Sequence, residues 1–208
     1  MDRTTRVIIV NFNAGDAVVR SVAAVLATRE ALHLSVADND SVDGSCERLR
    51  SLYAGNPRFE LLENGQNLGF ARAVNALAKG VQDRYLLILN PDCELFPGAL
   101  TELRKALEQD PTAGLAAPLV TDHRGRILSG TVRVFPEPWR ALMTATGMWR
   151  LGSRVRSLRG IEINPSESVQ ATRCEEAVSG ACMLVRTEVF RQLGGMDEGY
   201  GLHFEDLD

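Results

Sequence analysis

Four short apolar segments alternate with four helix-like segments, and this alternation constrains the fold more than any other feature of the chain. The apolar segments, typical of buried strands, are residues 7–10, 33–37, 59–62 and 85–89. The segments between and after them carry apolar side chains at near-helical spacing, at residues 16–28, 44–53, 69–79 and 97–109. Repeated strand–helix units predict an α/β fold, a mostly parallel, Rossmann-like sheet with helices on both faces.

The pattern changes in the second half. Residues 115–120 resemble a fifth strand, and residues 128–135 alternate as an antiparallel strand would. Residues 181–185 form another apolar strand, followed by a short helix over 187–193 that ends at two glycines. We therefore expect a smaller, antiparallel part beside the parallel sheet.

Composition excludes several classes of protein. The 23 basic and 27 acidic residues leave a net charge of −4, so a basic surface for nucleic acid is not expected. The strongest apolar run, residues 85–89, is far shorter than the ~20 residues that a membrane helix needs. Residues 1–6 are polar and charged, which argues against a signal peptide, and the four cysteines lack C-x-x-C spacing. These features favour a cytoplasmic protein with reduced thiols.

Polar residues follow each of the four predicted parallel strands, at 11–13, 38–40, 64–67 and 90–92. Any one of these Asn- and Asp-rich clusters is compatible with a simple turn. The carboxyl ends of parallel strands share one edge of a sheet, however, and ligands bind outside that edge. Four such clusters together predict a ligand site there.

Three of these positions suggest specific chemistry. Asp92 can hold a divalent cation that neutralises a diphosphate, with Glu94 assisting, although a turn before the next helix is the alternative. Asp38 can accept hydrogen bonds from a nucleobase, and Arg72 in the first turn of a helix suits a phosphate. A G-x-G-x-x-G fingerprint and a P-loop are both absent.

The last residues are rich in acids, including Glu205, Asp206 and Asp208. One of these carboxylates can act as a general base toward a hydroxyl group. A solvated acidic segment is the alternative.

Six motifs in order along the chain resemble glycosyltransferase family 2, which has the GT-A fold, and in particular its rhamnosyltransferase-like branch. The first three are Val7-Ile8-Ile9-Val10-Asn11-Phe12-Asn13, Asp38-Asn39-Asp40-Ser41-Val42-Asp43-Gly44-Ser45 and Asn67-Leu68-Gly69-Phe70-Ala71-Arg72-Ala73-Val74-Asn75. The others are Leu89-Asn90-Pro91-Asp92, Ser179-Gly180-Ala181-Cys182-Met183-Leu184-Val185-Arg186, and Gly194-Gly195-Met196-Asp197-Glu198 leading to Phe204-Glu205-Asp206-Leu207-Asp208.

The resemblance implies a role for each motif. Asp38 is expected to read the base, within a nucleotide pocket lined by Asn11, Asn13, Asn67, Gly69, Arg72 and Asn90. Asp92 matches the family's metal-binding carboxylate and implies a Mg²⁺ or Mn²⁺ cofactor. Gly180 and Ala181 are expected beside the donor sugar and the acceptor, and Asp206, next to Glu205, matches the catalytic base.

The implied function is inverting transfer of a sugar, such as rhamnose, from a dTDP- or UDP-sugar to a hydroxyl of a cell-surface glycan or lipid-linked acceptor. This activity belongs to cell-envelope polysaccharide biosynthesis. Residues 1–120 would be the nucleotide-sugar-binding half and residues 121–208 the acceptor-side half of one GT-A domain. Family members continue beyond the acidic motif, so the chain is expected to be truncated.

Two alternatives to an active transferase remain. A catalytically silent nucleotide-sugar-binding fragment is one. The other is a sugar-phosphate nucleotidyltransferase, which would need a Gly-rich, cationic loop after the first strand that residues 11–15 do not provide.

The second half also contains a candidate membrane-contact region. Residues 139–151 are amphipathic and residues 150–159 are rich in arginine. They could bring the protein to the inner face of the cytoplasmic membrane as a peripheral protein. A solvated face over a core helix is the alternative.

Overall fold

The computed structural model describes residues 4–128, 172, 174 and 177–199, and the backbone of residues 132–133 and 162–163. The first unit of the chain contains β1 (Thr5–Asn11), α1 (Asp16–Ala27), β2 (Leu32–Asp38), α2 (Ser45–Tyr53), β3 (Phe59–Glu63), α3 (Phe70–Ala78), β4 (Tyr85–Leu89), α4 (Ala99–Gln109), β5 (Leu115–Ala116), β9 (Cys182–Arg186) and α6 (Thr187–Gln192). The second unit contains β6 (Val132–Arg133), β7 (Glu162–Ile163) and β8 (Ala177–Val178).

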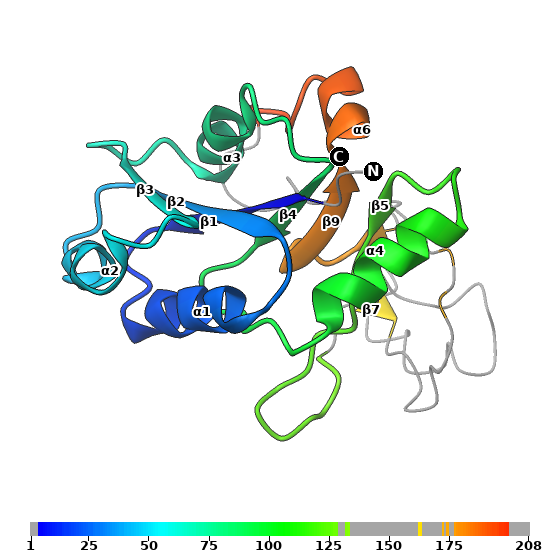
Figure 1. The fold of residues 1–208 in the computed structure, drawn as a ribbon, viewed down its shortest axis with the longest axis horizontal. Coiled ribbons are helices and arrows are strands. Elements are labelled where there is room, and N and C mark those ends of the chain that lie inside the picture. The colour runs from blue at the N-terminus through cyan, green and yellow to red at the C-terminus, as the bar shows by residue number, and fades with distance from the viewer. Residues whose placement is uncertain are drawn as a thin grey trace, which may run out of the picture. The chain divides into compact units, whose positions relative to one another are not determined.

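The main sheet has the strand order β3-β2-β1-β4-β9-β5. Strands β1 to β4 are mutually parallel, whereas β9 is antiparallel to both of its neighbours. Helices α3 and α6 lie on one side of the sheet, and α1, α2 and α4 lie on the other (Figure 1). The expected α/β fold, with a mostly parallel sheet and helices on both faces, is confirmed.

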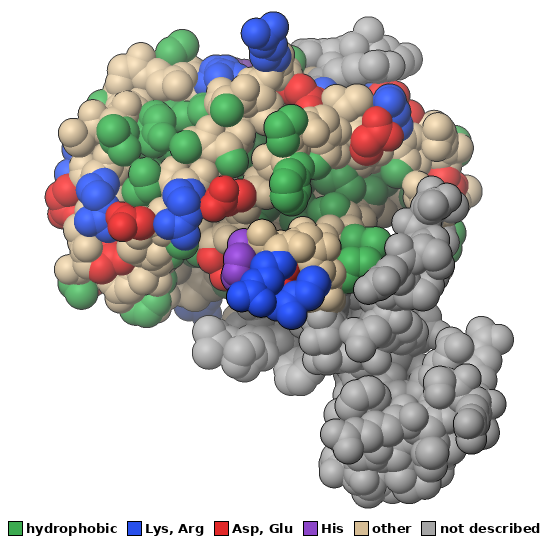
Figure 2. All heavy atoms as spheres, turned by 90° about the horizontal axis from the view of Figure 1, so that it is seen from below, with side chains coloured by type: hydrophobic (Ala, Val, Ile, Leu, Met, Phe, Trp, Pro, Cys, Tyr) green, Lys and Arg blue, Asp and Glu red, His purple; other side chains and the backbone are tan. Residues whose placement is uncertain are grey.

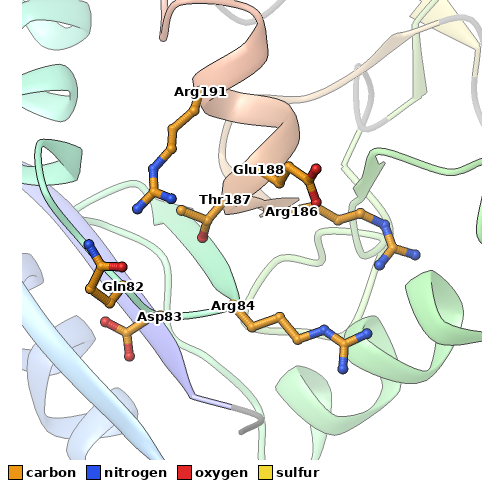
Figure 3. A pocket seen from close by; sticks show the side chains of 7 residues that line it. All are labelled: Gln82, Asp83, Arg84, Arg186, Thr187, Glu188 and Arg191. Atoms are coloured by element: carbon orange, nitrogen blue, oxygen red, sulfur yellow. The ribbon is translucent and has the colours of Figure 1, made fainter. Parts of the chain in front are cut away.

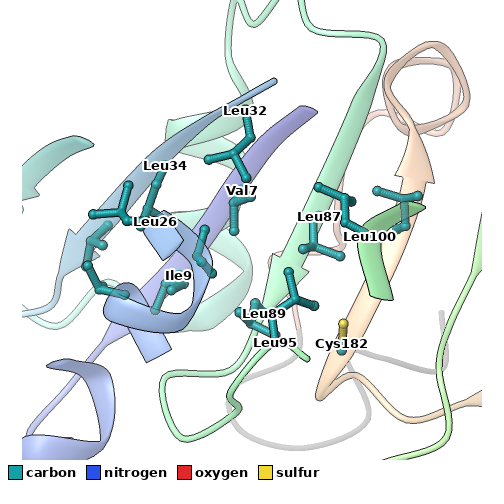
Figure 4. Close-up of a cluster of buried hydrophobic side chains, with 14 of the residues drawn as sticks. Val7, Ile9, Leu26, Leu32, Leu34, Leu87, Leu89, Leu95, Leu100 and Cys182 are labelled. Atoms are coloured by element: carbon teal, nitrogen blue, oxygen red, sulfur yellow. The ribbon is translucent and has the colours of Figure 1, made fainter. Parts of the chain in front are cut away.

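The alternation of side chains along the strands builds two apolar layers. Val7 and Ile9 of β1 and Leu87 of β4 join side chains of α1 and α4 in one buried cluster (Figure 4). Their neighbours in sequence, such as Ile8, point to the opposite face, because successive strand side chains alternate. Helix α3 packs on that second face, against β1 and β2.

Two of the predicted boundaries differ from the structure for reasons local to the backbone. The fifth strand, predicted over residues 115–120, ends at Ala116, because Pro118 has no amide hydrogen to continue the ladder. Helix α4, predicted from Pro97, begins at Ala99, because Gly98 adopts the left-handed conformation at φ 83°.

The described residues divide into two compact units, residues 4–116 with 180–199 and the described residues between 117 and 179. The second unit contains a three-stranded antiparallel sheet of order β7-β6-β8 and a turn closed by the Thr121–Ile127 bridge. The proposed division at residue 120 stays a prediction. Residues 139–151 and 150–159 lie outside the described residues, and no described helix is long and apolar enough to cross a bilayer.

Candidate functional site

The ends of β1 and β2 carry a buried Asn–Asp pair. Asn11 and Asp38 are register partners on these parallel strands, and Asn11 Nδ2 donates to Asp38 Oδ1 over 2.6 Å. The other carboxylate oxygen of Asp38 accepts from the Ser41 amide over 3.0 Å. Asp38 is only 4% exposed, so these donors compensate for its burial. Both predicted residues are therefore brought together at the predicted edge of the sheet.

The loops that follow β1 and β2 are joined by reciprocal hydrogen bonds. The Asn13 amide donates to Ser41 Oγ over 2.9 Å, and the Val42 amide donates back to Asn13 Oδ1 over 2.8 Å. Asn13 has a φ of 53°, a conformation that Asn tolerates better than most residues. Asn13 thus has a role in holding the two loops together that its motif alone did not reveal.

Asp43 strengthens the same junction. Its carboxylate accepts from the Gly15 amide over 2.6 Å and from the Ser45 hydroxyl over 2.5 Å. The Ser45 hydroxyl is the largest cause that holds the pKa of Asp43 below its usual value. Burial opposes it as the second-largest effect, and hydrogen bonds from backbone amides add to the lowering. Asp43 therefore remains ionised and ties the start of α1 to the start of α2.

A network of amide side chains connects β2, β3 and α3. Asn39 Nδ2 donates to Asn67 Oδ1 and to the Gly69 carbonyl, each over 3.2 Å. Asn64 Nδ2 donates to Asn39 Oδ1 over 2.8 Å, and Asn67 Oδ1 also accepts from the Gly69 amide over 2.9 Å. The sequence predicts Asn39 only as a member of the polar cluster at residues 38–40, without a role of its own. Its side chain is 2% exposed and is held by this network, because a buried amide needs partners.

The end of β4 contacts the start of β9. The Asn90 amide donates to the Ala181 carbonyl over 2.9 Å, so the predicted Gly180–Ala181 turn lies beside Asn90. Asp92, two residues further on, is exposed. Burial first, and the nearby Asp92 carboxylate second, raise the pKa of the Cys93 thiol to about 11. Asp92 is therefore accessible to solvent at the edge where β4 ends, because its side chain is exposed and it follows Asn90 by two residues.

Asp92 fits a cation that arrives with its own oxygen ligands. No group of three or more His, Cys, Asp or Glu side chains in the described residues makes a ready-made metal site. Mg²⁺ is commonly bound by one or two carboxylates together with substrate phosphates, and one exposed carboxylate suits that mode. Glu94, expected to assist, instead pairs with Arg20 at 3.1 Å.

Arg72 lies in the first turn of α3, with its side chain 60% exposed. Its Nε lies 3.5 Å from Glu198 Oε2. The sequence predicts Arg72 as a phosphate ligand and includes Glu198 in a motif, but it does not predict that the two residues pair, because 126 positions separate them. The proposed base Asp206 and its neighbour Glu205 lie outside the described residues.

The molecular surface on the side of α1 carries interspersed charges. Figure 2 shows acidic and basic side chains interspersed over much of this face, with one group of basic side chains beside a histidine. The exposed ion pairs of the first unit include Arg20–Glu94, at 3.1 Å, and Arg48–Asp16, at 3.4 Å. Such exposed pairs each contribute little to stability.

A hollow of about 300 Å³ lies at the opposite end of the main sheet (Figure 3). Its lining includes Asp83, Arg186 and Arg191. Arg186 and Arg191 donate to the backbone carbonyls of Leu107 and Val81, and Asp83 pairs with Arg6. These charged groups therefore join secondary-structure elements to one another.

Comparison with known proteins supports one family. The family model described as "Glycosyl transferase family 2" matches residues 6–167. Over 216 aligned positions the chain is 31% identical to an N-acetylglucosaminyl-diphospho-decaprenol L-rhamnosyltransferase of Mycobacterium tuberculosis, covering 97% of this chain and 67% of the relative.

Solved structures share the fold at low sequence identity. The mannosyltransferase PcManGT of Pyrobaculum calidifontis, in complex with GDP-Man and Mn²⁺, aligns with a TM-score of 0.59 and 18% identity, over 98% of this chain and 50% of its own. S. aureus TarS 1-349 in complex with UDP aligns with a TM-score of 0.57 and 11% identity, over 100% and 53%. The chain spans about half the length of these solved chains.

Proposed function

Because the chain belongs to glycosyltransferase family 2, we propose that it transfers a sugar from a nucleoside-diphosphate donor to an acceptor hydroxyl, with inversion at the anomeric carbon. The observation that carries this proposal is the convergence of Asn11, Asp38, Asn90 and the exposed Asp92 on the carboxyl edge of one sheet. The relative's name supports rhamnose as the sugar and a lipid-linked acceptor.

The nucleoside would bind over the β1–β2 end of this edge. Among the described residues, each oxygen of Asp38 accepts one side-chain or backbone hydrogen bond. Each oxygen has a further lone pair, with which the carboxylate can accept from a base N–H. The Phe12 ring, next to Asn11 and 51% exposed, offers an apolar surface to the base. These two side chains suit a nucleobase that offers an N–H donor, as the bases of UDP and dTDP do.

The diphosphate would lie between α3 and Asp92. The first turn of α3 presents backbone amides and Arg72, both of which favour an anion. Asp92 would hold Mg²⁺ or Mn²⁺, and such a cation stabilises the charge that develops on a leaving diphosphate. The Mn²⁺ and GDP-Man bound to PcManGT support this assignment at the level of the fold.

Asp206, assisted by Glu205, would remove the proton from the acceptor hydroxyl. The hydroxyl oxygen then forms its bond to the anomeric carbon while the bond to the diphosphate breaks. This assignment rests on the resemblance of the Glu205-Asp206 motif. Gly180 and Ala181 would line the sugar side of the site, since the Ala181 carbonyl accepts from the Asn90 amide.

An acceptor of this kind would assign the proposed reaction to cell-envelope biosynthesis, at the cytoplasmic face of a membrane. A decaprenol-linked sugar, as in the relative's name, is anchored in a bilayer, so its transferase must work at the bilayer surface. A peripheral protein with a basic segment such as residues 150–159 suits that location.

A transfer assay tests the proposal. The chain is incubated with dTDP-rhamnose or UDP-sugars and a lipid-linked N-acetylglucosamine, with and without Mn²⁺, and the glycolipid product is measured. We expect product that requires the cation and disappears in Asp206→Asn. Donor binding without any product would favour the silent binding fragment, and the absence of binding would refute both functions.

A further inference from the structure

The loop after α6 is attached to the middle of α3 by a two-way amide contact. Asn75 Nδ2 donates to the Met196 carbonyl and the Met196 amide donates to Asn75 Oδ1, each over 2.9 Å. One side chain thus satisfies both backbone polar groups of a residue 121 positions away. This pairing fixes the position of the loop along the helix, because a shift would break both bonds together.

Gly195 allows this contact to form. Its φ is 91°, and a Cβ atom built there would lie 2.5 Å from Asn75 Oδ1. Any side chain at this position would both strain the backbone and displace Asn75. The close approach of the loop to α3 therefore depends on a glycine.

Glu198 extends the contact to the first turn of α3. Its Oε1 accepts from Asn75 Nδ2 over 3.0 Å, and its Oε2 lies 3.5 Å from Arg72 Nε. Arg72 and Asn75 are three positions apart and so lie on the same face of the helix. Glu198 therefore bridges two neighbouring side chains of one helix.

The order of these contacts shows that the loop runs antiparallel to α3. Met196 contacts Asn75 in the second turn of α3, and Glu198 reaches Arg72 in the first turn. The first turn follows Asn67 and Gly69 at the carboxyl edge of the sheet. The loop thus runs back along α3 toward the edge that holds the candidate site.

We propose that Asn75 is a positioning residue for transfer, acting through the loop of residues 194–198. By holding Met196 and Glu198, it sets the position of the Arg72 guanidinium relative to the loop. This inference rests on the proposed function, in which Arg72 contacts the donor diphosphate. A loosened loop would leave Arg72 able to bind phosphate but would no longer hold its guanidinium in the orientation that transfer requires.

The test compares Asn75→Ala with the parent chain in two measurements. In Asn75→Ala, hydrogen exchange at the Met196 amide should become at least about tenfold faster, because this amide loses Asn75 Oδ1 as its acceptor. The Gly195 amide, which donates to the Phe190 carbonyl, serves as the internal control. In the transfer assay, kcat should fall at least about tenfold while the donor KM changes less than about threefold.

Two further variants separate positioning from simple loss of structure. Asn75→Asp places a carboxylate against Glu198 and should lower kcat as Asn75→Ala does. Adding Glu198→Gln to Asn75→Asp restores a donor–acceptor pair and should recover part of kcat. Glu188→Gln is the matched control for Glu198→Gln, because Glu188 lies on α6 and accepts a hydrogen bond from Gln192. It should leave kcat unchanged.

The outcomes distinguish this inference from the proposed function. Unchanged Met196 exchange in Asn75→Ala, or faster exchange with unaltered kcat, would overturn the positioning role. A parent chain that transfers no sugar would overturn the proposed function and with it any role of Asn75 in transfer. Faster exchange with lower kcat, a stable KM and recovery in the double variant would support the inference.

Discussion

Asn11 and Asp38 lie side by side at the ends of two parallel strands, with 2.6 Å between Asn11 Nδ2 and Asp38 Oδ1. Asn11 is fully buried, and its Nδ2 also lies within hydrogen-bond distance of the Ser41 and Ser45 hydroxyls. The amide therefore supports a buried carboxylate and two loops at once.

Replacing Asn11 by Leu should destabilise the fold, because it leaves a buried carboxylate without its side-chain donor. We expect a loss of about 1–3 kcal/mol in the free energy of unfolding. Chemical denaturation at neutral pH measures this loss. Asn56→Ala, in the turn before the start of β3, is the control. An equal loss of stability in both variants would contradict a special role for Asn11.

Asp38→Asn should weaken binding of UDP and dTDP by about 1.5–3 kcal/mol, the contribution of a charge-assisted hydrogen bond to the base. Isothermal titration calorimetry gives the affinities. Because Asp38 also accepts from Asn11 and Ser41, a thermal melt must first establish that the variant is folded. Unchanged affinity in a folded variant would move the base contact elsewhere.

Asp92→Asn should abolish the cation-dependent part of nucleoside-diphosphate binding, since the neutral amide is a poorer ligand for Mg²⁺ or Mn²⁺. Calorimetric titrations with and without Mn²⁺ measure that part. Glu94→Gln is the matched control, because Glu94 pairs with Arg20 and should not contribute. An Asp92→Asn chain that keeps its full cation dependence would exclude Asp92 as the metal ligand.

Ser45→Ala should raise the pKa of Asp43 toward its ordinary value, because the Ser45 hydroxyl is the largest cause of the lowered pKa. A depressed folded-state pKa stabilises the fold above the unfolded-state value, and this stabilisation is lost as the pH falls through the folded-state pKa. The variant should therefore lose less stability on acidification than the parent. Carboxyl titration by NMR, with denaturation between pH 2 and 6, measures both effects.

Gly195→Ala should cost more stability than Gly194→Ala. Both residues have a positive φ, 91° and 85°, so each substitution carries about 1–2 kcal/mol of backbone strain. Only at Gly195 does the new Cβ meet Asn75 Oδ1, because nothing lies within 4 Å at Gly194. The difference between the two free energies of unfolding reports this contact, and equal losses would show that Asn75 yields without cost.

Local patterns in the sequence determined most of the secondary structure and the edge on which the site lies. The strand predicted at residues 85–89 matches β4 at both ends. A short run of large apolar residues is by itself a strong signal for a buried strand. The sequence predicts Asn11, Asp38 and Asn90 at one edge of the sheet, because each lies at the end of a strand and the carboxyl ends of parallel strands share an edge. The short β5 and the start of α4 depart from the pattern where Pro118 and Gly98 limit the backbone.

Only the tertiary structure decided which distant residues meet. Strand β9 inserts between β4 and β5 and runs antiparallel to both, a choice set by packing across the whole sheet. Glu94 meets Arg20, and Asn75 meets Met196, across 74 and 121 positions. No periodicity or spacing encodes such pairs, because hydrogen bonds and ion pairs act over a few ångströms in space, whatever the separation along the chain.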